Sequence, residues 1–148
     1  MRKRSFFRYA IVLFLFTVLV AICVWKMVSI TSLKIDADNL VAGLEEAGLS
    51  DFRVRWYDRE VHINDPLFDD DQLRELSPEI EAFSGLGYLD LARSSISDAG
   101  LLSIDFERFD DLRLVRVDDT KVSEKGLAKA RLHHPGTVFT ATVPSFER

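Results

Sequence analysis

The sequence predicts an α/β chain: a short solenoid of about three coils, with parallel strands and convex helices, preceded by a helix-hairpin cap and one transmembrane helix. Three observations predict it. Residues 96–101 (ISDAGL) and 122–127 (VSEKGL) repeat one pattern at an offset of 26 residues. The stretches before them alternate apolar and polar residues, as half-buried strands do. Residues 10–25 contain no charged residue, which is typical of a membrane span.

The apolar run near the N-terminus predicts a single-pass membrane protein. We expect residues 1–8 to form a cytoplasmic basic tail and residues 9–30 to form the membrane-spanning helix, with the Lys26 amine reaching the lipid headgroups. Residues 1–32 contain five basic residues and no acidic residue, and such a cationic flank stays on the cytoplasmic side. The C-terminal domain is then periplasmic or otherwise extracytoplasmic.

Two other interpretations of this run stay open. Cleavage as a signal peptide needs small residues just after the apolar core, but Trp25, Lys26 and Met27 follow it here. A lipidation motif is also incomplete, because Ile22 stands where that motif has a small residue before Cys23. An uncleaved anchor fits the sequence better than either.

Charge is distributed unevenly between the span and the rest of the chain. Residues 33–148 hold 14 of the 19 basic residues and all 24 acidic residues, which gives them a net charge of −10. This excludes the basic surface typical of nucleic-acid binding, and it should repel anionic lipid. Cys23 is the only cysteine, so the C-terminal domain must be held together by packing rather than by disulfides.

The repeated pattern extends into the residues before it. Residues 86–96 and 112–122 both fit L-x-x-L-x-L-x-x-N-x-L, with Ser94 and Thr120 in place of the usual Asn. The aliphatic positions are Leu86, Leu89, Leu91 and Ile96 in one copy and Leu112, Val115, Val117 and Val122 in the other. Similar spacing relates Ile63, Phe68 and Leu73, so residues 61–73 form a third, degenerate copy.

On these residues, the region from about 60 to 140 resembles short bacterial leucine-rich-repeat proteins of the ribonuclease-inhibitor-like type. Its SDAGL and SEKGL steps are similar to those of families with T-D-x-G-L repeats. The resemblance implies parallel strands that stack into one core, because a single short strand cannot bury its apolar face alone. We expect the leucine-rich-repeat domain to cover residues 61–143 and a tail to follow at 144–148.

Residues 31–60 are expected to link the span to this domain and to cap its first strand. Residues 36–50 have helical spacing, with Gly48 as the stop. Residues 51–63 alternate and can form a hairpin around Asp58-Arg59. A competing interpretation is a small α-β-β unit resembling periplasmic lipid-associated folds, but the strand at 61–63, shared with the repeat, favours the cap.

Each copy carries residues suited to begin a short helix after its strand. The N-cap candidates are Asp69, Ser97 and Ser123, and Gln72 completes a capping box with Asp69. Gly100 and Gly126 fall in the first helical turn, where glycine costs up to ~1 kcal/mol relative to alanine. We therefore expect these glycines to allow close packing against the neighbouring coil.

No set of residues predicts catalysis, a cofactor or a metal. The adjacent His133 and His134 would point apart on an extended chain, so a solvated turn is expected there. The acids at 69–71 lack the glycine and the spacing of a calcium-binding loop, and they suit the first turn of a helix. The sequence has no G-x-S-x-G motif. We expect that the protein is not an enzyme and that it binds no cofactor and no small-molecule ligand.

The best candidate for a functional surface is the side of the strands that faces away from the core. Its residues are predicted to be His62, Tyr88, Asp90, Leu114, Arg116 and Asp118, with Glu60 in the same frame and with Arg55 and Tyr57 as an extension. Aromatic, arginine and exposed leucine side chains are typical anchors of protein interfaces. We expect Tyr88, Leu114 and His62 to form one row outside the core. Charge reversal at Arg116 combined with Tyr88→Ala should then leave stability nearly unchanged.

These observations favour a membrane-anchored module that binds an unidentified protein on the outer side of the inner membrane. The alternative is a structural or sensory subunit of a membrane complex, whose partner binds the apolar helix at 9–30 instead. Substitutions on the outward face of the strands separate the two hypotheses, because only the first requires that face.

Overall fold

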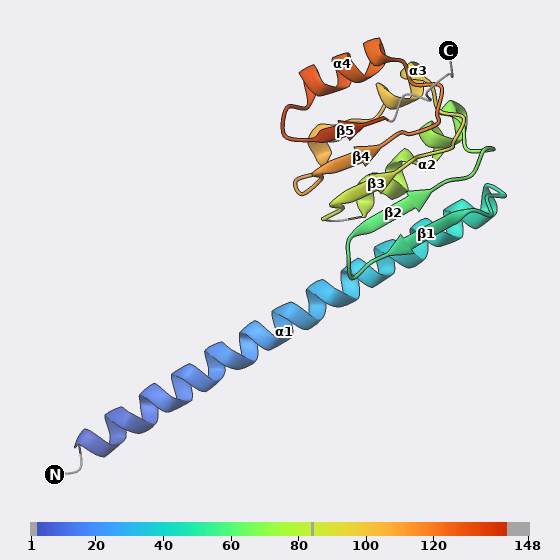
Figure 1. Cartoon of the computed structure of the whole chain (residues 1–148). Coiled ribbons are helices and arrows are strands. Elements are labelled where there is room, and N and C mark those ends of the chain that lie inside the picture. Colours follow the sequence, from blue (N-terminus) through green and yellow to red (C-terminus); the bar gives the residue numbers. More distant parts are fainter. Residues whose placement is uncertain (1–2, 84, 142–148) are drawn as a thin grey trace. The chain divides into compact units, whose positions relative to one another are not determined.

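The computed structural model describes residues 3–83 and 85–141, with side chains from residue 13 onward. Positions 142–143 of the predicted repeat domain and the predicted tail at 144–148 lie outside the described residues. The chain is a mixed α/β protein with one long apolar N-terminal helix and a five-stranded sheet (Figure 1), as predicted at that level. The elements are α1 (Lys3–Glu46), β1 (Phe52–Arg55), β2 (Glu60–Ile63), α2 (Asp70–Ala82), β3 (Tyr88–Asp90), α3 (Asp98–Leu101), η1 (Phe106–Arg108), β4 (Leu114–Arg116), α4 (Glu124–His133) and β5 (Val138–Thr140).

Helix α1 is long and apolar enough to cross a membrane. Among the residues whose side chains are described, the candidate span begins at Leu13. The helix continues through residues 31–35, where the sequence predicts a linker, because no glycine or proline interrupts it before Gly43. It ends at Glu46, and Gly48 follows with a φ of 76°, as expected for the predicted stop. By internal contacts the chain divides into two compact units, Met1–Lys34 and Ile35–Arg148.

The sheet contains the predicted hairpin and a parallel run of strands. Strands β1 and β2 pair antiparallel, and β2 also pairs parallel with β3, which joins the hairpin to the same sheet. Strands β4 and β5 continue the parallel order. The register aligns Val61, Leu89, Val115 and Phe139 side by side, at successive spacings of 28, 26 and 24 residues.

The core lies between the sheet and a layer of helices (Figure 1), to which the end of α1 and helices α2, α3 and α4 contribute. The predicted aliphatic positions fill it: Leu91 is 0 % exposed, and Val122 alone among the eight named for the two better copies is only partly buried. Leu73, Leu101 and Leu127 reach the same core from the three helices that follow β2, β3 and β4. The alternation in the sequence therefore predicted which side of each strand is buried.

The turns after β3 and β4 are held by the side chains that stand in place of the usual Asn. The Ser94 hydroxyl donates to the Leu91 carbonyl at 2.7 Å, and the Thr120 hydroxyl donates to the Val117 carbonyl at 2.8 Å. Asp69, Ser97 and Ser123 are N-caps, and Asp69 forms a capping box with Gln72. Helix α3 is only four residues long, and the 3-10 helix η1 follows it.

One contact recurs between successive strand–helix pairs, and we call it the Ser–Asp junction. The Asp70 carboxylate accepts hydrogen bonds from the Ser97 backbone N–H at 2.8 Å and from the Ser97 hydroxyl at 2.5 Å. Asp98 accepts the same pair from Ser123, both at 2.6 Å. A Cβ added at Gly100 would overlap the Asp70 carboxylate, and one at Gly126 would overlap that of Asp98. The close packing expected of both glycines is confirmed.

Candidate protein-binding face

The side of the sheet opposite the helices is the candidate functional surface, and we call it the strand face. Its residues point away from the core in two rows set by the register. One row is Arg55, Glu60, Tyr88, Leu114 and Val138, and the other is Arg53, His62, Asp90, Arg116 and Thr140. Asp118 follows β4 and joins the second row through a contact with Arg116. The structure thus brings all six predicted site residues together.

The predicted row of Tyr88, Leu114 and His62 is wrong on β2, where Glu60, two residues before His62, lies in the row. The register places Glu60 beside Tyr88 and places His62 beside Asp90. The reason is geometric: His62 lies between two buried residues of its strand, and the matching positions on β3 and β4 are Asp90 and Arg116. Tyr88 and Leu114 remain neighbours, in the row that begins at Arg55.

Arg116 is the centre of a charged network on the second row. Its Nε donates to the Asp118 carboxylate, and its Nη1 lies 3.3 Å from Asp90 Oδ2. The hydrogen bond that Arg116 donates to Asp118 and the charge of Asp90 raise the pKa of Arg116, so the guanidinium stays charged. The other oxygen of Asp90 accepts the Ala92 backbone N–H at 3.0 Å, which fixes the carboxylate below the arginine.

The network continues through His62 to the hairpin. His62 Nδ1 lies 3.2 Å from Asp90 Oδ2, and its Nε2 lies 3.2 Å from Glu60 Oε2. Arg55 Nη1 approaches the same Glu60 oxygen at 3.5 Å. Side chains from β1, β2, β3 and β4 are therefore linked across the sheet by polar contacts.

Tyr88 packs against this network from the first row. Its ring meets that of His62 edge to face, with centroids 5.2 Å apart. Burial and the nearby Asp90 charge raise the pKa of the Tyr88 hydroxyl, so it remains a neutral hydrogen-bonding group on this face at neutral pH.

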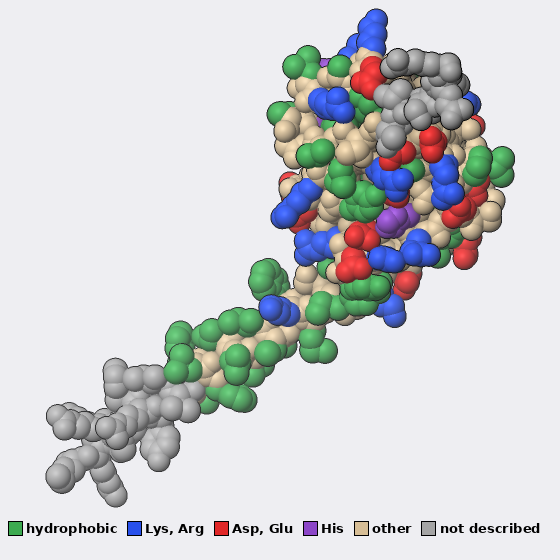
Figure 2. Space-filling model, in the orientation of Figure 1, with side chains coloured by type: hydrophobic (Ala, Val, Ile, Leu, Met, Phe, Trp, Pro, Cys, Tyr) green, Lys and Arg blue, Asp and Glu red, His purple; other side chains and the backbone are tan. Residues whose placement is uncertain are grey.

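The charged side chains of the strand face differ in how deeply they are buried. The side chains of Asp90 and Asp118 are only 4 % and 11 % exposed, whereas that of Arg116 is 46 % exposed. The two aspartates lie on the outward side of the sheet and are nevertheless buried, because arginine covers them. Figure 2 shows basic, acidic and hydrophobic side chains intermingled over the sheet.

Three residues of the strand face were missed by the sequence reasoning. Arg53 is exposed and lies beside His62, while Val138 and Thr140 of β5 are exposed beside Leu114 and Arg116. The alternation of residues 51–57 and 138–143 was visible in the sequence, and applying the outward frame to those strands would have found them. Tyr57, expected to extend the face, lies in the hairpin turn against Trp56 instead.

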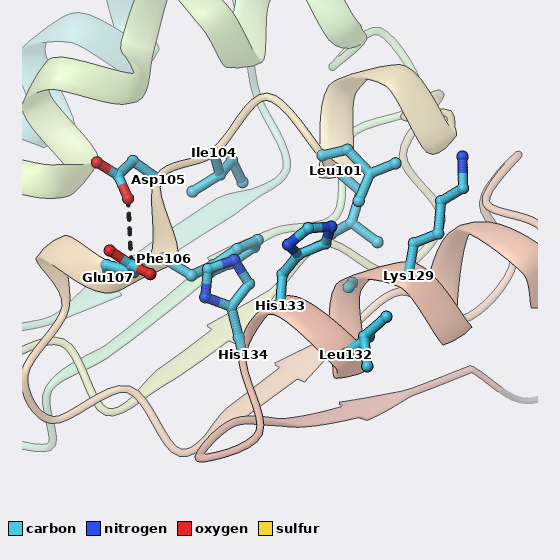
Figure 3. A pocket seen from close by; sticks show the side chains of 11 residues that line it. Leu101, Ile104, Asp105, Phe106, Glu107, Lys129, Leu132, His133 and His134 are labelled. Atoms are coloured by element: carbon cyan, nitrogen blue, oxygen red, sulfur yellow. Dashed lines mark hydrogen bonds between the residues drawn. The ribbon is translucent and has the colours of Figure 1, made fainter.

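A cavity of about 570 Å³ lies on the helix side, between the α3–η1 segment and the end of α4 (Figure 3). His133 and His134 line it as the last residue and the C-cap of α4, rather than in the predicted solvated turn. The Phe106 ring packs against His134 with centroids 4.9 Å apart. Within the described ranges, no group of three or more His, Cys, Asp or Glu residues could hold a metal ion.

The strand face and the cavity differ in how they are built. The face is linked across four strands by the contacts of Arg116, His62 and Glu60, whereas the cavity is lined by a mixture of leucine, aromatic and charged side chains without such a network. The face is therefore the better candidate for recognition. No family model, curated protein or solved structure matches this chain.

Proposed function

We propose that this chain is a membrane-anchored, leucine-rich-repeat type module that binds a protein through its strand face, on the outer side of the membrane. The observation that carries the proposal is an uncovered sheet face. Among the described residues from Ile35 onward, no helix or strand lies over it (Figure 1), although it presents aromatic, aliphatic and arginine side chains. Aromatic and arginine side chains are the types that dominate binding energy at protein interfaces.

The repeat interpretation is supported by the register and by the Ser–Asp junctions. Equivalent residues of three sequence copies lie side by side, and each junction joins one strand–helix pair to the next. Stacked units that contact only their neighbours are typical of repeat proteins. The proposal includes no catalytic role.

The membrane topology is tested separately. The cationic start of the chain favours an N-terminus in the cytoplasm. An alkaline phosphatase fused after Arg148 should be active, because that enzyme needs the disulfides that form outside the cytoplasm. Green fluorescent protein at the same position should be dark, and the reverse pattern would contradict the proposed orientation.

Binding through the strand face is tested by proximity labelling with the full-length chain in its membrane. The variant Tyr88→Ala with Leu114→Ser removes the apolar half of the face, and both residues are only half-buried. Leu132→Ser is the matched control, because Leu132 is 79 % exposed on α4, on the helix side. The face variant should lose labelled partners that the control retains.

A third variant distinguishes the membrane helix as the binding element. Residues 9–30 are replaced with an unrelated apolar span, so that insertion is kept and the helix surface is changed. Unchanged partners in the face variant, together with their loss in the span variant, would reject the proposal in favour of a subunit that binds its partner within the membrane.

A further inference from the structure

The accessible charge on the strand face is mainly basic, although the surrounding domain is acidic. Arg116 is half-exposed above two nearly buried aspartates, and Arg55 and Glu60 are 37 % and 30 % exposed as a pair at the edge. A partner therefore meets guanidinium groups first. The acids below them hold the arginines in place and offer little surface of their own.

Arg53 adds a second accessible guanidinium at the other end of the same row. It is exposed, and within the described part of the chain no side chain pairs with it. Arg53 and Arg116 stand three strands apart through His62 and Asp90, which places their backbones roughly 14 Å apart at about 4.8 Å per strand. Two accessible arginines at this spacing, of which Arg116 is held by Asp90 and Asp118, can bind two acidic groups.

An apolar row runs beside these arginines. The register aligns Tyr88, Leu114 and Val138, and Val138 is 59 % exposed. An extended peptide rises about 3.4 Å per residue, so residues four apart span roughly 14 Å and point to the same side. Acidic residues at i and i+4 with apolar residues near them would match both rows.

We infer that the strand face binds an extended, acidic and apolar protein segment, with carboxylates on Arg53 and Arg116 and aliphatic side chains on the Tyr88 row. This inference rests on the proposed function and specifies the chemistry of its partner. A protein segment fits better than an anionic membrane, because a short segment meets only the strand face. A membrane surface also meets the surrounding domain, and the net charge of −10 on residues 33–148 opposes that approach.

The test uses the full-length chain in nanodiscs of neutral phosphatidylcholine. Three pools of ten-residue peptides carry Glu, Gln or Lys at positions i and i+4, with leucine or valine at i+2 and random residues elsewhere. Bound peptides are counted by mass spectrometry. We expect enrichment of the Glu pool over the Gln pool, and Arg53→Gln should reduce it by up to about fivefold, the upper end for one exposed charge pair.

Arg74→Gln is the matched control, because Arg74 is an exposed arginine on α2 that pairs only with Asp71. It should leave the enrichment of the Glu pool unchanged. An equal loss in Arg74→Gln and Arg53→Gln would show general charge attraction and overturn the inference. Arg53 is chosen first because it is exposed, so its substitution should leave the fold unchanged.

The remaining outcomes separate this inference from the proposed function. Enrichment of the Lys or Gln pool that Tyr88→Ala abolishes would reject the acidic partner and leave the binding face standing. Binding of every pool without dependence on the face would reject both. Flotation with phosphatidylglycerol vesicles, if it exceeded that with phosphatidylcholine and were lost in Arg53→Gln, would replace the protein segment with a lipid surface.

Discussion

On the helix side of the sheet, equivalent positions of successive strands carry the same chemistry: Leu89, Val115 and Phe139 lie side by side and are at most 2 % exposed. On the strand face, the row of His62, Asp90 and Arg116 changes chemistry at every strand. Positions that recur thus build the core, and positions that vary build a specific surface. Substitutions on the two sides should therefore differ in what they disturb.

The largest loss of stability should come from the helix side. Leu91 is fully buried, so Leu91→Ala should lower the free energy of unfolding by about 2–5 kcal/mol. The measurement is urea denaturation of the full-length chain in detergent, followed by tryptophan fluorescence in a Trp25→Phe background, so that Trp56 alone reports. A loss below ~1 kcal/mol would show that the helix side tolerates cavities and would weaken the contrast between the sides.

The Ser–Asp junction should give the next largest effect. Gly100→Ala places a methyl group against the Asp70 carboxylate and should cost about 1–3 kcal/mol. In an Asp70→Ala background that conflict disappears, and the same substitution should be neutral or should stabilise by up to ~1 kcal/mol. The double-mutant cycle measures this coupling. Additive effects would mean that Gly100 is required for another reason.

On the strand face, the two arginines should behave differently from each other. Arg116→Gln leaves the buried Asp90 and Asp118 without their cation and should cost about 1–2 kcal/mol, below the value for a fully buried pair because Arg116 is half-exposed. Arg53→Gln should cost less than ~0.5 kcal/mol. Thermal midpoints of both variants check this, and equal midpoints would contradict the layered arrangement.

Acid should weaken the junctions by a small, measurable amount. Hydrogen bonds from the Ser123 hydroxyl and backbone hold the pKa of Asp98 below its ordinary value, which is about 3.9 when unfolded. The resulting stability is present above pH ~4 and is lost as pH falls through the lower folded pKa. Asp98→Asn should therefore lose about 1 kcal/mol at pH 7 and show a flatter pH dependence below pH 4. An unchanged slope would exclude Asp98 as a contributor.

The sequence predicted the helix side well because the information there is local. Alternation along each strand identifies Leu89 and Leu91 as buried, and residues beside the turns identify Ser97 and Ser123 as caps. It did not predict the acceptor role of Asp70, since the Ser97 groups that donate to it lie 27 residues away. The run at 69–71 therefore looked like helix-starting acids alone, a reading that is correct for Asp69.

The sequence predicted which residues belong to the strand face, but it did not predict how deeply each of them is buried. A period of two separates inside from outside, and it correctly placed Tyr88, Leu114 and Arg116 away from the core. It cannot show that Arg116 covers Asp90 and Asp118, because that burial depends on side chains of two strands and the following loop. The error on β2, where His62 was placed in the row that Glu60 occupies, arose for a related reason, because register is a property of the pair of strands.

The most direct test of the central claim compares two exposed aliphatic positions on opposite sides of the sheet. Val138 is 59 % exposed on the strand face, and Leu132 is 79 % exposed on α4. The photo-crosslinker p-benzoylphenylalanine replaces each in turn in the full-length chain, and intact cells are irradiated before the adducts are separated by mass. Our account predicts a discrete protein adduct from position 138 and none from position 132. An adduct from position 132 alone would contradict it and move the binding surface to the helix side.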